Sequence, residues 1–141
     1  MMEVRTAKLP VGETDTKLVI LALGANVDAE ENIYKALGLL QAHLASMHHS
    51  HPVWTAPIGL QSEDFLNCVV QGQCDIEFEE LCQLTKEIEQ ICGNTIEKRK
   101  KGEIVMDIDI LQYGGKKYHR PDWKRLYIRE GLKELIIAVN K

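Results

Sequence analysis

The sequence has no hydrophobic run long enough to cross a membrane, and its first 17 residues lack the apolar core of a signal peptide. Its four cysteines show no C-x-x-C spacing, which argues against a zinc ribbon and against a dithiol redox pair. Internal repeats and low-complexity segments are also absent. We therefore expect a cytoplasmic protein with reduced cysteines, in which residues 1–17 form a flexible segment and residues 18–141 form a single domain.

Aromatic residues are scarce, at 6% of the chain, and the formal net charge is −4. RNA-recognition domains have adjacent aromatics on central strands and a positive charge, so we expect no nucleic-acid partner. The charge is nevertheless unevenly distributed, because residues 1–93 hold 5 Lys/Arg against 14 Asp/Glu, whereas residues 94–141 hold 12 against 7. The basic part of the chain could neutralise a polyphosphate, although solvated surface lysines are the simpler explanation for any single residue.

Apolar runs and helical periodicities alternate along the chain. The expected elements in the first half are a buried strand at 18–23, a helix at about 29–46, and extended chain at 48–55. A capping box of Asp28 and Glu31 would start this helix. The second half is expected to contain a strand at 65–74, a helix around 81–91, a basic loop, and a strand at 104–111 before a Gly114-Gly115 turn. This β-α-β-β-α-β order predicts a ferredoxin-like α+β sandwich. Two helices would cover one face of an antiparallel sheet and leave the other face for a ligand.

The last predicted strand contains two aspartates one residue apart, Asp107 and Asp109, within an otherwise apolar run. Successive strand side chains point to opposite faces, so both carboxylates share one face while Met106, Ile108 and Ile110 occupy the other. Two like charges there disfavour each other's ionisation, and a divalent cation would remove the conflict. The alternative is an edge strand with a solvated face, where acidic residues need no ligand.

A second unusual pair is Phe65 and Asn67, which fall on one face of the strand at 65–74. An aromatic ring offers a stacking surface and a carboxamide both donates and accepts hydrogen bonds, so together they suit a flat heteroaromatic ligand. The alternative places Phe65 in the core and leaves Asn67 to cap a turn.

At this point the chain resembles the hydroxymethyl-dihydropterin pyrophosphokinases (HPPK) of folate synthesis, from Leu18 to about Leu135. The motifs that carry the resemblance are Leu23-Gly-Ala-Asn26 for L-G-S-N, Thr55-Ala-Pro-Ile-Gly59 for T-x-P-x-G, Phe65-Leu-Asn67 for [YF]-L-N, Ile88-Glu89 with Gly93 for I-E-x-x-x-G, and Met106-Asp-Ile-Asp-Ile-Leu111 for L-D-L-D-I-L. Each motif is weak alone, but they occur in the family's order.

The resemblance implies an HPPK-like domain that transfers a pyrophosphoryl group from ATP to the hydroxymethyl oxygen of the pterin and releases AMP. It implies two Mg²⁺ ions on Asp107 and Asp109, which with Arg125 form the expected catalytic set. The expected pterin-binding residues are Thr55, Ile58, Phe65, Asn67 and Tyr127. The expected nucleotide-binding residues are Glu89, Lys98, Arg99, Lys101, Ile110 and Arg125.

The chain also departs from the family pattern. Before the aspartates the family has R-x-x-R-W-G-P-R, but here Lys101 occupies the tryptophan position and Ile104 the last arginine position. The family's P-H-x-x-x-x-x-R-x-F segment is interpreted as shortened to Pro121–Tyr127, which puts Asp122 at the histidine position. Lysine supplies charge but not bidentate phosphate recognition. The alternative function is therefore a non-catalytic paralogue that binds a pterin or nucleotide without turnover.

Overall fold

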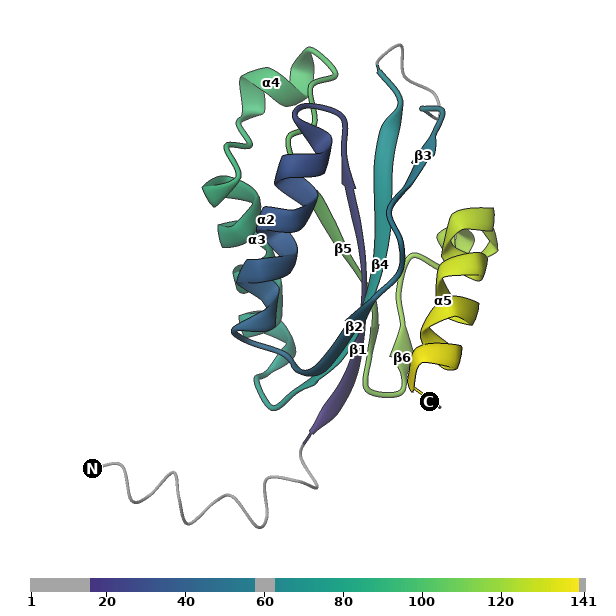
Figure 1. The fold of residues 1–141 in the computed structure, drawn as a ribbon. Helices are drawn as coiled ribbons and strands as arrows, with labels where there is room; N and C mark the ends of the chain where they lie inside the picture. The colour runs from purple at the N-terminus through teal and green to yellow at the C-terminus, as the bar shows by residue number, and fades with distance from the viewer. Residues whose placement is uncertain (1–15, 58–62, 140–141) are drawn as a thin grey trace, which may run out of the picture.

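A six-stranded antiparallel sheet forms the centre of the molecule, with strand order β2-β4-β1-β5-β6 and β3 paired to β4. The computed structural model describes residues 16–57 and 63–139, so residues 1–15 of the predicted N-terminal segment lie outside the described part. Two long helices lie on one side of the sheet and one on the other (Figure 1). The ferredoxin-like α+β arrangement predicted from the sequence is confirmed.

Strand β1, Lys17–Ala25, occupies the middle of this sheet, between β4 (Phe65–Cys74) and β5 (Asp107–Tyr113). Its apolar run is buried on both faces, because alternate residues pack toward opposite helix layers. The short strands β2, Ala45–His49, and β3, Val53–Thr55, both pair antiparallel with β4, and β2 begins within the range that was predicted as helix. The centre of the sheet is therefore a rigid platform for the residues at its edges.

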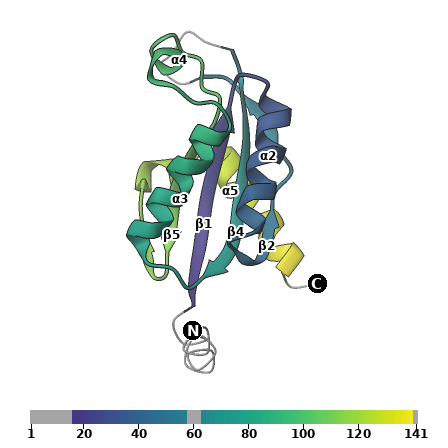
Figure 2. The ribbon, with the colours of Figure 1, turned by 90° about the vertical axis from the view of Figure 1, so that its left-hand side faces the viewer.

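Helices α2, Ala29–Gln41, and α3, Phe78–Ile91, cover one face of the sheet (Figure 2). Their buried sides carry residues such as Ile33, Leu40 and Leu81, which pack on the alternate side chains of β1, β4 and β5. The first helix is shorter than predicted. Leu44 keeps the helical spacing and is buried, but it reaches the core from the connection that follows α2.

The predicted capping box at the start of α2 is wrong. Asp28 adopts a left-handed conformation, with φ 43°, and its side chain makes no capping hydrogen bond. Instead, Asn32 Nδ2 donates to the Val27 carbonyl at 2.8 Å. A capping box does form at α3, where the Glu77 side chain accepts from the N3 backbone and Glu80 Oε1 accepts from the Glu77 N–H at 3.0 Å. Gly93 follows α3 with φ 107°, a left-handed conformation that glycine adopts readily and that ends the helix.

The segment between α3 and β5 was predicted as a basic loop, but it contains a short helix, α4, Ile96–Lys100. Thr95 caps it by accepting from the Lys98 N–H at 3.1 Å. After β5, a turn at Gly114-Gly115 leads into β6, Lys116–Lys117, and then a 3₁₀ helix, η1, Arg120–Lys124. Many of the basic residues of the C-terminal part thus lie on short, locally ordered elements.

Helix α5, Leu126–Val139, covers the sheet face that the sequence analysis left free (Figure 1). Its Ile128 and Leu135 are fully buried against Ile20, Val69 and Leu111. Gly131 allows this approach, because a Cβ there would lie 2.8 Å from a methyl carbon of Val69. The prediction of an open second face is therefore wrong where α5 packs, and among the described residues a cavity remains at the end of the sheet beside η1 and β3.

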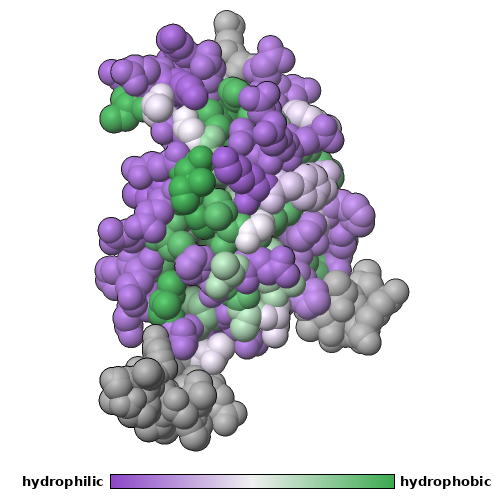
Figure 3. All heavy atoms as spheres, turned by 60° about the vertical axis from the view of Figure 1, so that its left-hand side comes forward, coloured by the Kyte–Doolittle hydropathy of each residue, from purple (hydrophilic) through white to green (hydrophobic). Residues whose placement is uncertain are grey.

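The outer surface of the α2–α3 side is mainly hydrophilic, with apolar atoms gathered in its middle (Figure 3). All four cysteines are free, and burial raises the pKa of the Cys68 thiol to about 11, which keeps it protonated and unreactive. Across residues 16–57 and 63–139, no helix combines the length and the hydrophobicity needed to span a bilayer.

Candidate active site

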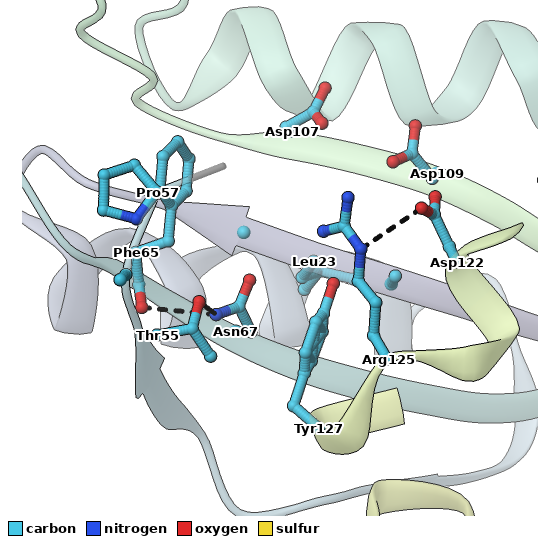
Figure 4. Close-up of a pocket in the computed structure, with 13 residues that line it drawn as sticks. Leu23, Thr55, Pro57, Phe65, Asn67, Asp107, Asp109, Asp122, Arg125 and Tyr127 are labelled. Carbon is cyan, nitrogen blue, oxygen red and sulfur yellow. Dashed lines mark hydrogen bonds and ion pairs between the residues drawn. The ribbon is translucent and has the colours of Figure 1, made fainter. Parts of the chain in front are cut away.

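A cavity of about 210 Å³ opens at the end of the sheet where β1, β4 and β5 meet β3 and the start of α5 (Figure 4). It brings together residues predicted from separate motifs far apart in the chain. The lining residues are Ala22, Leu23, Gly24, Thr55, Ala56, Pro57, Phe65, Asn67, Asp107, Asp109, Asp122, Arg125 and Tyr127. One end is aromatic and amide-bearing, and the other is charged.

At the aromatic end, the rings of Phe65 and Tyr127 stand on either side of Asn67 (Figure 4). Asn67 is 6% exposed, and its Nδ2 donates to Thr55 Oγ1 at 2.6 Å and to the Phe65 carbonyl at 3.2 Å. Its donor side is thus used within the protein, which leaves the carbonyl oxygen to face the cavity (Figure 4). Because the Thr55 hydroxyl accepts from Asn67, its own proton can be donated to a ligand.

At the charged end, Asp107 and Asp109 lie on the same face of β5, as predicted, with their side chains 40% and 38% exposed. Burial, and after it the negative charge of Asp107, raises the pKa of Asp109 above its usual range. The intervening Ile108 is buried against the α2–α3 layer. The two carboxylates therefore repel each other in a shared half-buried space, which a cation would stabilise.

Three basic side chains stand beside the carboxylates of the site. Arg99 Nη2, from α4, is 2.9 Å from Asp107 Oδ1, and His119 Nε2 is 3.9 Å from Asp109 Oδ1. Arg125 lies across the cavity and contacts Asp122. The pKa of the Tyr127 hydroxyl is raised by burial, so this ring stays neutral beside the charges.

The aspartate pair has the donor chemistry of a magnesium site. Mg²⁺ usually takes one or two carboxylates, together with waters and phosphate oxygens. Among the described residues, no group of three or more His, Cys, Asp or Glu side chains is placed to hold a metal. The protein would therefore supply Asp107 and Asp109, and the ligand would supply the remaining oxygens.

A second cavity, of about 180 Å³, lies on the other side of Asp109. Its lining residues are Phe78, Cys82, Thr85, Lys86, Ile108, Asp109, Ile110, Tyr118 and His119. Phe78 and Tyr118 stack with their ring centroids 4.9 Å apart. Asp109 lines both cavities, so two ligands, one in each cavity, would come close together at this carboxylate.

The structure brings Thr55, Phe65, Asn67, Asp107, Asp109, Arg125 and Tyr127 to the first cavity, and it places the predicted nucleotide residue Ile110 at the second. Ile58 lies outside the described residues. Lys98 Nζ donates to the Gly93 carbonyl at 3.1 Å, and Lys101 ends α4 in an exposed position.

Glu89 is only 9% exposed and is turned into the protein. Its Oε2 accepts a hydrogen bond from the Ile108 N–H at 2.8 Å, between the two aspartates. Burial raises the pKa of Glu89 above its usual range, although the hydrogen bond from Ile108 opposes that shift. In this arrangement Glu89, on α3, holds the backbone of β5 between the two aspartates.

Asn26, which directly follows β1, holds the altered segment before the aspartates through two hydrogen bonds. Its Oδ1 accepts from the Ile104 N–H at 2.7 Å, and its Nδ2 donates to the Gly102 carbonyl at 2.8 Å. Ile104 is 8% exposed and belongs to the core, so the last arginine position of the family pattern is used for packing here. Arg99 instead brings a guanidinium to Asp107.

Sequence reasoning missed His119, Asp122 and Gly24 as residues of this region. His119 precedes Arg125 with five residues between them, and Tyr127 follows two later, which is the spacing of H-x-x-x-x-x-R-x-F. This spacing, together with the position of His119 Nε2 3.9 Å from Asp109 Oδ1, favours His119 over Asp122 for the histidine position, and the segment then keeps the family's length.

Comparison with known proteins gives a consistent result. The model of the family described as "7,8-dihydro-6-hydroxymethylpterin-pyrophosphokinase (HPPK)" matches residues 20–137. The "2-amino-4-hydroxy-6-hydroxymethyldihydropteridine pyrophosphokinase" of Bacillus subtilis (strain 168) is 29% identical over 136 residues, covering 88% of this chain and 81% of that protein. The "Folate synthesis bifunctional protein" of Arabidopsis thaliana is 30% identical over 129 residues, covering 84% of this chain but only 27% of that protein.

Proposed function

The chain belongs to the 7,8-dihydro-6-hydroxymethylpterin-pyrophosphokinase family, and from this we propose that it transfers a pyrophosphoryl group from ATP to 6-hydroxymethyl-dihydropterin. In this reaction the hydroxymethyl oxygen forms a bond to the β-phosphorus of ATP. The bond from that phosphorus to the oxygen bridging the α-phosphate breaks, and AMP leaves with the bridging oxygen. The hydroxyl proton is released to solvent.

The observation that carries this proposal is that two cavities meet at Asp109. The first cavity suits the flat pterin, with Phe65 and Tyr127 at its faces and Thr55 and Asn67 at its polar edge. The second suits the nucleoside of ATP, beside Ile110. The triphosphate would then cross the half-buried carboxylates of β5, which is where the transferred group has to pass.

The protein's contribution to catalysis is positioning and electrostatic stabilisation, without a covalent nucleophile. Asp107 and Asp109 would hold Mg²⁺, which supplies positive charge to the triphosphate when it is bound. Arg125, Arg99 and His119 lie close enough to the carboxylates to contact phosphate oxygens. Reaching ATP would require Arg99 to exchange Asp107 for a phosphate.

The remaining predicted contacts belong to the same proposal. Ile58 would contribute to the pterin site, and Lys98, in α4, and Lys101, its C-cap, would approach the nucleotide. Glu89 would act on the nucleotide mainly by fixing β5, since its carboxylate is hydrogen-bonded to Ile108. Rearrangement around α4 on ATP binding would bring these groups nearer to the phosphates.

Incubating the full chain with ATP, Mg²⁺ and 6-hydroxymethyl-dihydropterin tests the proposal, with AMP quantified by chromatography. AMP that forms only when the pterin is present is the expected result. Pterin binding without AMP would identify a non-catalytic paralogue instead. If neither the pterin nor a nonhydrolysable ATP analogue bound in titration calorimetry, the proposal would be refuted.

A further inference from the structure

The first cavity contains a third carboxylate, Asp122, for which no family motif provides a role. Its Oδ1 lies 3.3 Å from Nε of Arg125, and the Arg125 backbone N–H donates to the Asp122 carbonyl at 3.0 Å. The two side chains are 28% and 42% exposed. Because η1 ends between these residues, a backbone bond and a side-chain contact together fix the guanidinium relative to the cavity.

The position of Asp122 is electrostatically unfavourable unless its charge has a use. Asp107 and Asp109 already place two carboxylates in this cavity, and Asp122 adds a third negative charge to the same lining. ATP would add more negative charge. An exposed pair at i and i+3 stabilises a fold only slightly, so the contribution to stability does not account for a carboxylate at this place.

Arg125 has two side-chain partners in the cavity, Asp122 and the Tyr127 hydroxyl, and they leave other donors of its guanidinium available. Asp122 approaches Nε, and the two Nη nitrogens point toward the strand that carries Asp107 and Asp109 (Figure 4). A planar guanidinium held in one orientation loses less conformational freedom when it contacts a phosphate. The charge of Asp122 is meanwhile partly neutralised by its partner.

We propose that Asp122 is a positioning residue, which holds Arg125 by Nε so that its Nη nitrogens meet the transferred pyrophosphoryl group. The inference rests on the proposed function, because Arg125 is expected to contact phosphate only in that reaction. It adds to it a residue to which none of the family motifs gives a role, and which is proposed to act through Arg125.

The test is a double-mutant cycle on the full chain, with Asp122→Asn, Arg125→Ala and the combined variant. Rates of AMP formation and KM values for ATP and for the pterin are measured for each protein, and Asp122→Glu tests rescue by a conservative change. Glu130→Gln is the matched control, because Glu130 forms an i,i+3 pair with Lys133 at 3.4 Å outside the first cavity.

We expect Asp122→Asn to lower kcat by roughly 10- to 100-fold while leaving the KM for the pterin nearly unchanged. In the Arg125→Ala background the same change should alter kcat by less than about twofold, since the residue to be positioned is gone. Asp122→Glu should recover part of the lost rate. An equal loss in both backgrounds, no loss at all, or an equal loss in Glu130→Gln would overturn the inference.

Failure of the proposed function gives a different result. If the wild-type chain forms no AMP, the cycle is instead measured as the affinity for a nonhydrolysable ATP analogue with Mg²⁺, by titration calorimetry. Coupling between Asp122 and Arg125 in that affinity would support the positioning role without turnover, and independent effects would overturn it. Absence of analogue binding by the wild-type chain would overturn both proposals.

Discussion

Replacing Glu89 with alanine should destabilise the protein, because this side chain holds the middle of the aspartate strand. Strand β6 is only two residues long and pairs with Gln112 and Tyr113, so it does not extend to Ile108. The Glu89 carboxylate therefore takes the place of a neighbouring strand for the Ile108 N–H, at 2.8 Å. Alanine would remove that acceptor and leave a buried N–H without a partner.

The expected cost follows from this single hydrogen bond. A bond to a charged acceptor contributes about 1.5–3 kcal/mol, and an unsatisfied buried donor carries a penalty of similar size, so Glu89→Ala should cost about 2–3 kcal/mol. For a chain of this length that corresponds to a fall in Tm of roughly 5–10 °C. Glu89→Gln keeps an acceptor oxygen and should stay within about 1 kcal/mol of wild type.

The pH dependence separates the two variants further. Burial raises the pKa of Glu89 in the folded state, so ionised Glu89 favours unfolding as the pH rises through that raised value. Relative to wild type, Glu89→Gln should therefore gain stability between acidic and neutral pH, and the gain should vanish below the usual carboxyl range. Thermal and urea unfolding at several pH values measure this, with the exposed neighbour Glu87→Ala as control.

Two outcomes would refute the reasoning. If Glu89→Ala and Glu89→Gln lost equal stability, the hydrogen bond to Ile108 would not be the relevant contact. If Glu89→Ala kept its stability but lost affinity for a nonhydrolysable ATP analogue, Glu89 would contact the nucleotide directly, and its role behind β5 would be wrong.

Further predictions concern metal binding, the pterin site and α5. Replacing both Asp107 and Asp109 with asparagine should abolish Mg²⁺-dependent nucleotide binding in titration calorimetry. The same variant should keep or slightly raise Tm, because the repulsion between the two carboxylates disappears. Unchanged nucleotide affinity would contradict the metal assignment. Gly24→Ala should weaken pterin binding in a fluorescence titration without unfolding the protein, since its Cβ would lie 3.3 Å from Asn67 Oδ1; unaltered affinity would show that the amide is not used. Leu135→Ala should cost about 2–5 kcal/mol in urea unfolding, whereas the adjacent, 58% exposed Ile136→Ala should cost little, and equal costs would contradict the packing of α5.

Local periodicity was sufficient for the central strands and for the two side-chain pairs Phe65/Asn67 and Asp107/Asp109, whereas Thr55, Arg125 and Tyr127 were expected only from the resemblance to the family. Alternation along 65–74 and 107–111 decides which side chains share a face, and those faces are the ones that meet at the cavity. Helix α5 was missed although Ile128, Leu132 and Leu135 recur at helical spacing. Recognising it removes the open sheet face and leaves a confined site.

Other features depend on tertiary contacts that periodicity does not encode. The end of α2 was misjudged because Leu44 packs in the core from outside the helix while keeping a helical interval. Two contacts join separate elements: the hydrogen bond between Glu89 and Ile108, and the ion pair between Arg99 and Asp107. The sequence spacing of these residues does not indicate which ones are partners. The contact between Asp122 and Arg125 is local, but its importance depends on a cavity built by distant strands.

Helix α5 has one end at the ligand site and the other in the core, since Tyr127 lines the cavity and Leu135 is fully buried. The packing of this helix on the sheet and the binding of a ligand are consequently linked equilibria. A ligand that contacts the first turn of α5 also stabilises the packing of its later turns. The saturated complex should exchange its amide hydrogens in α5 more slowly than the free protein. A substitution that weakens the packing of Leu135 should therefore lower the ligand affinity, although Leu135 does not line the cavity.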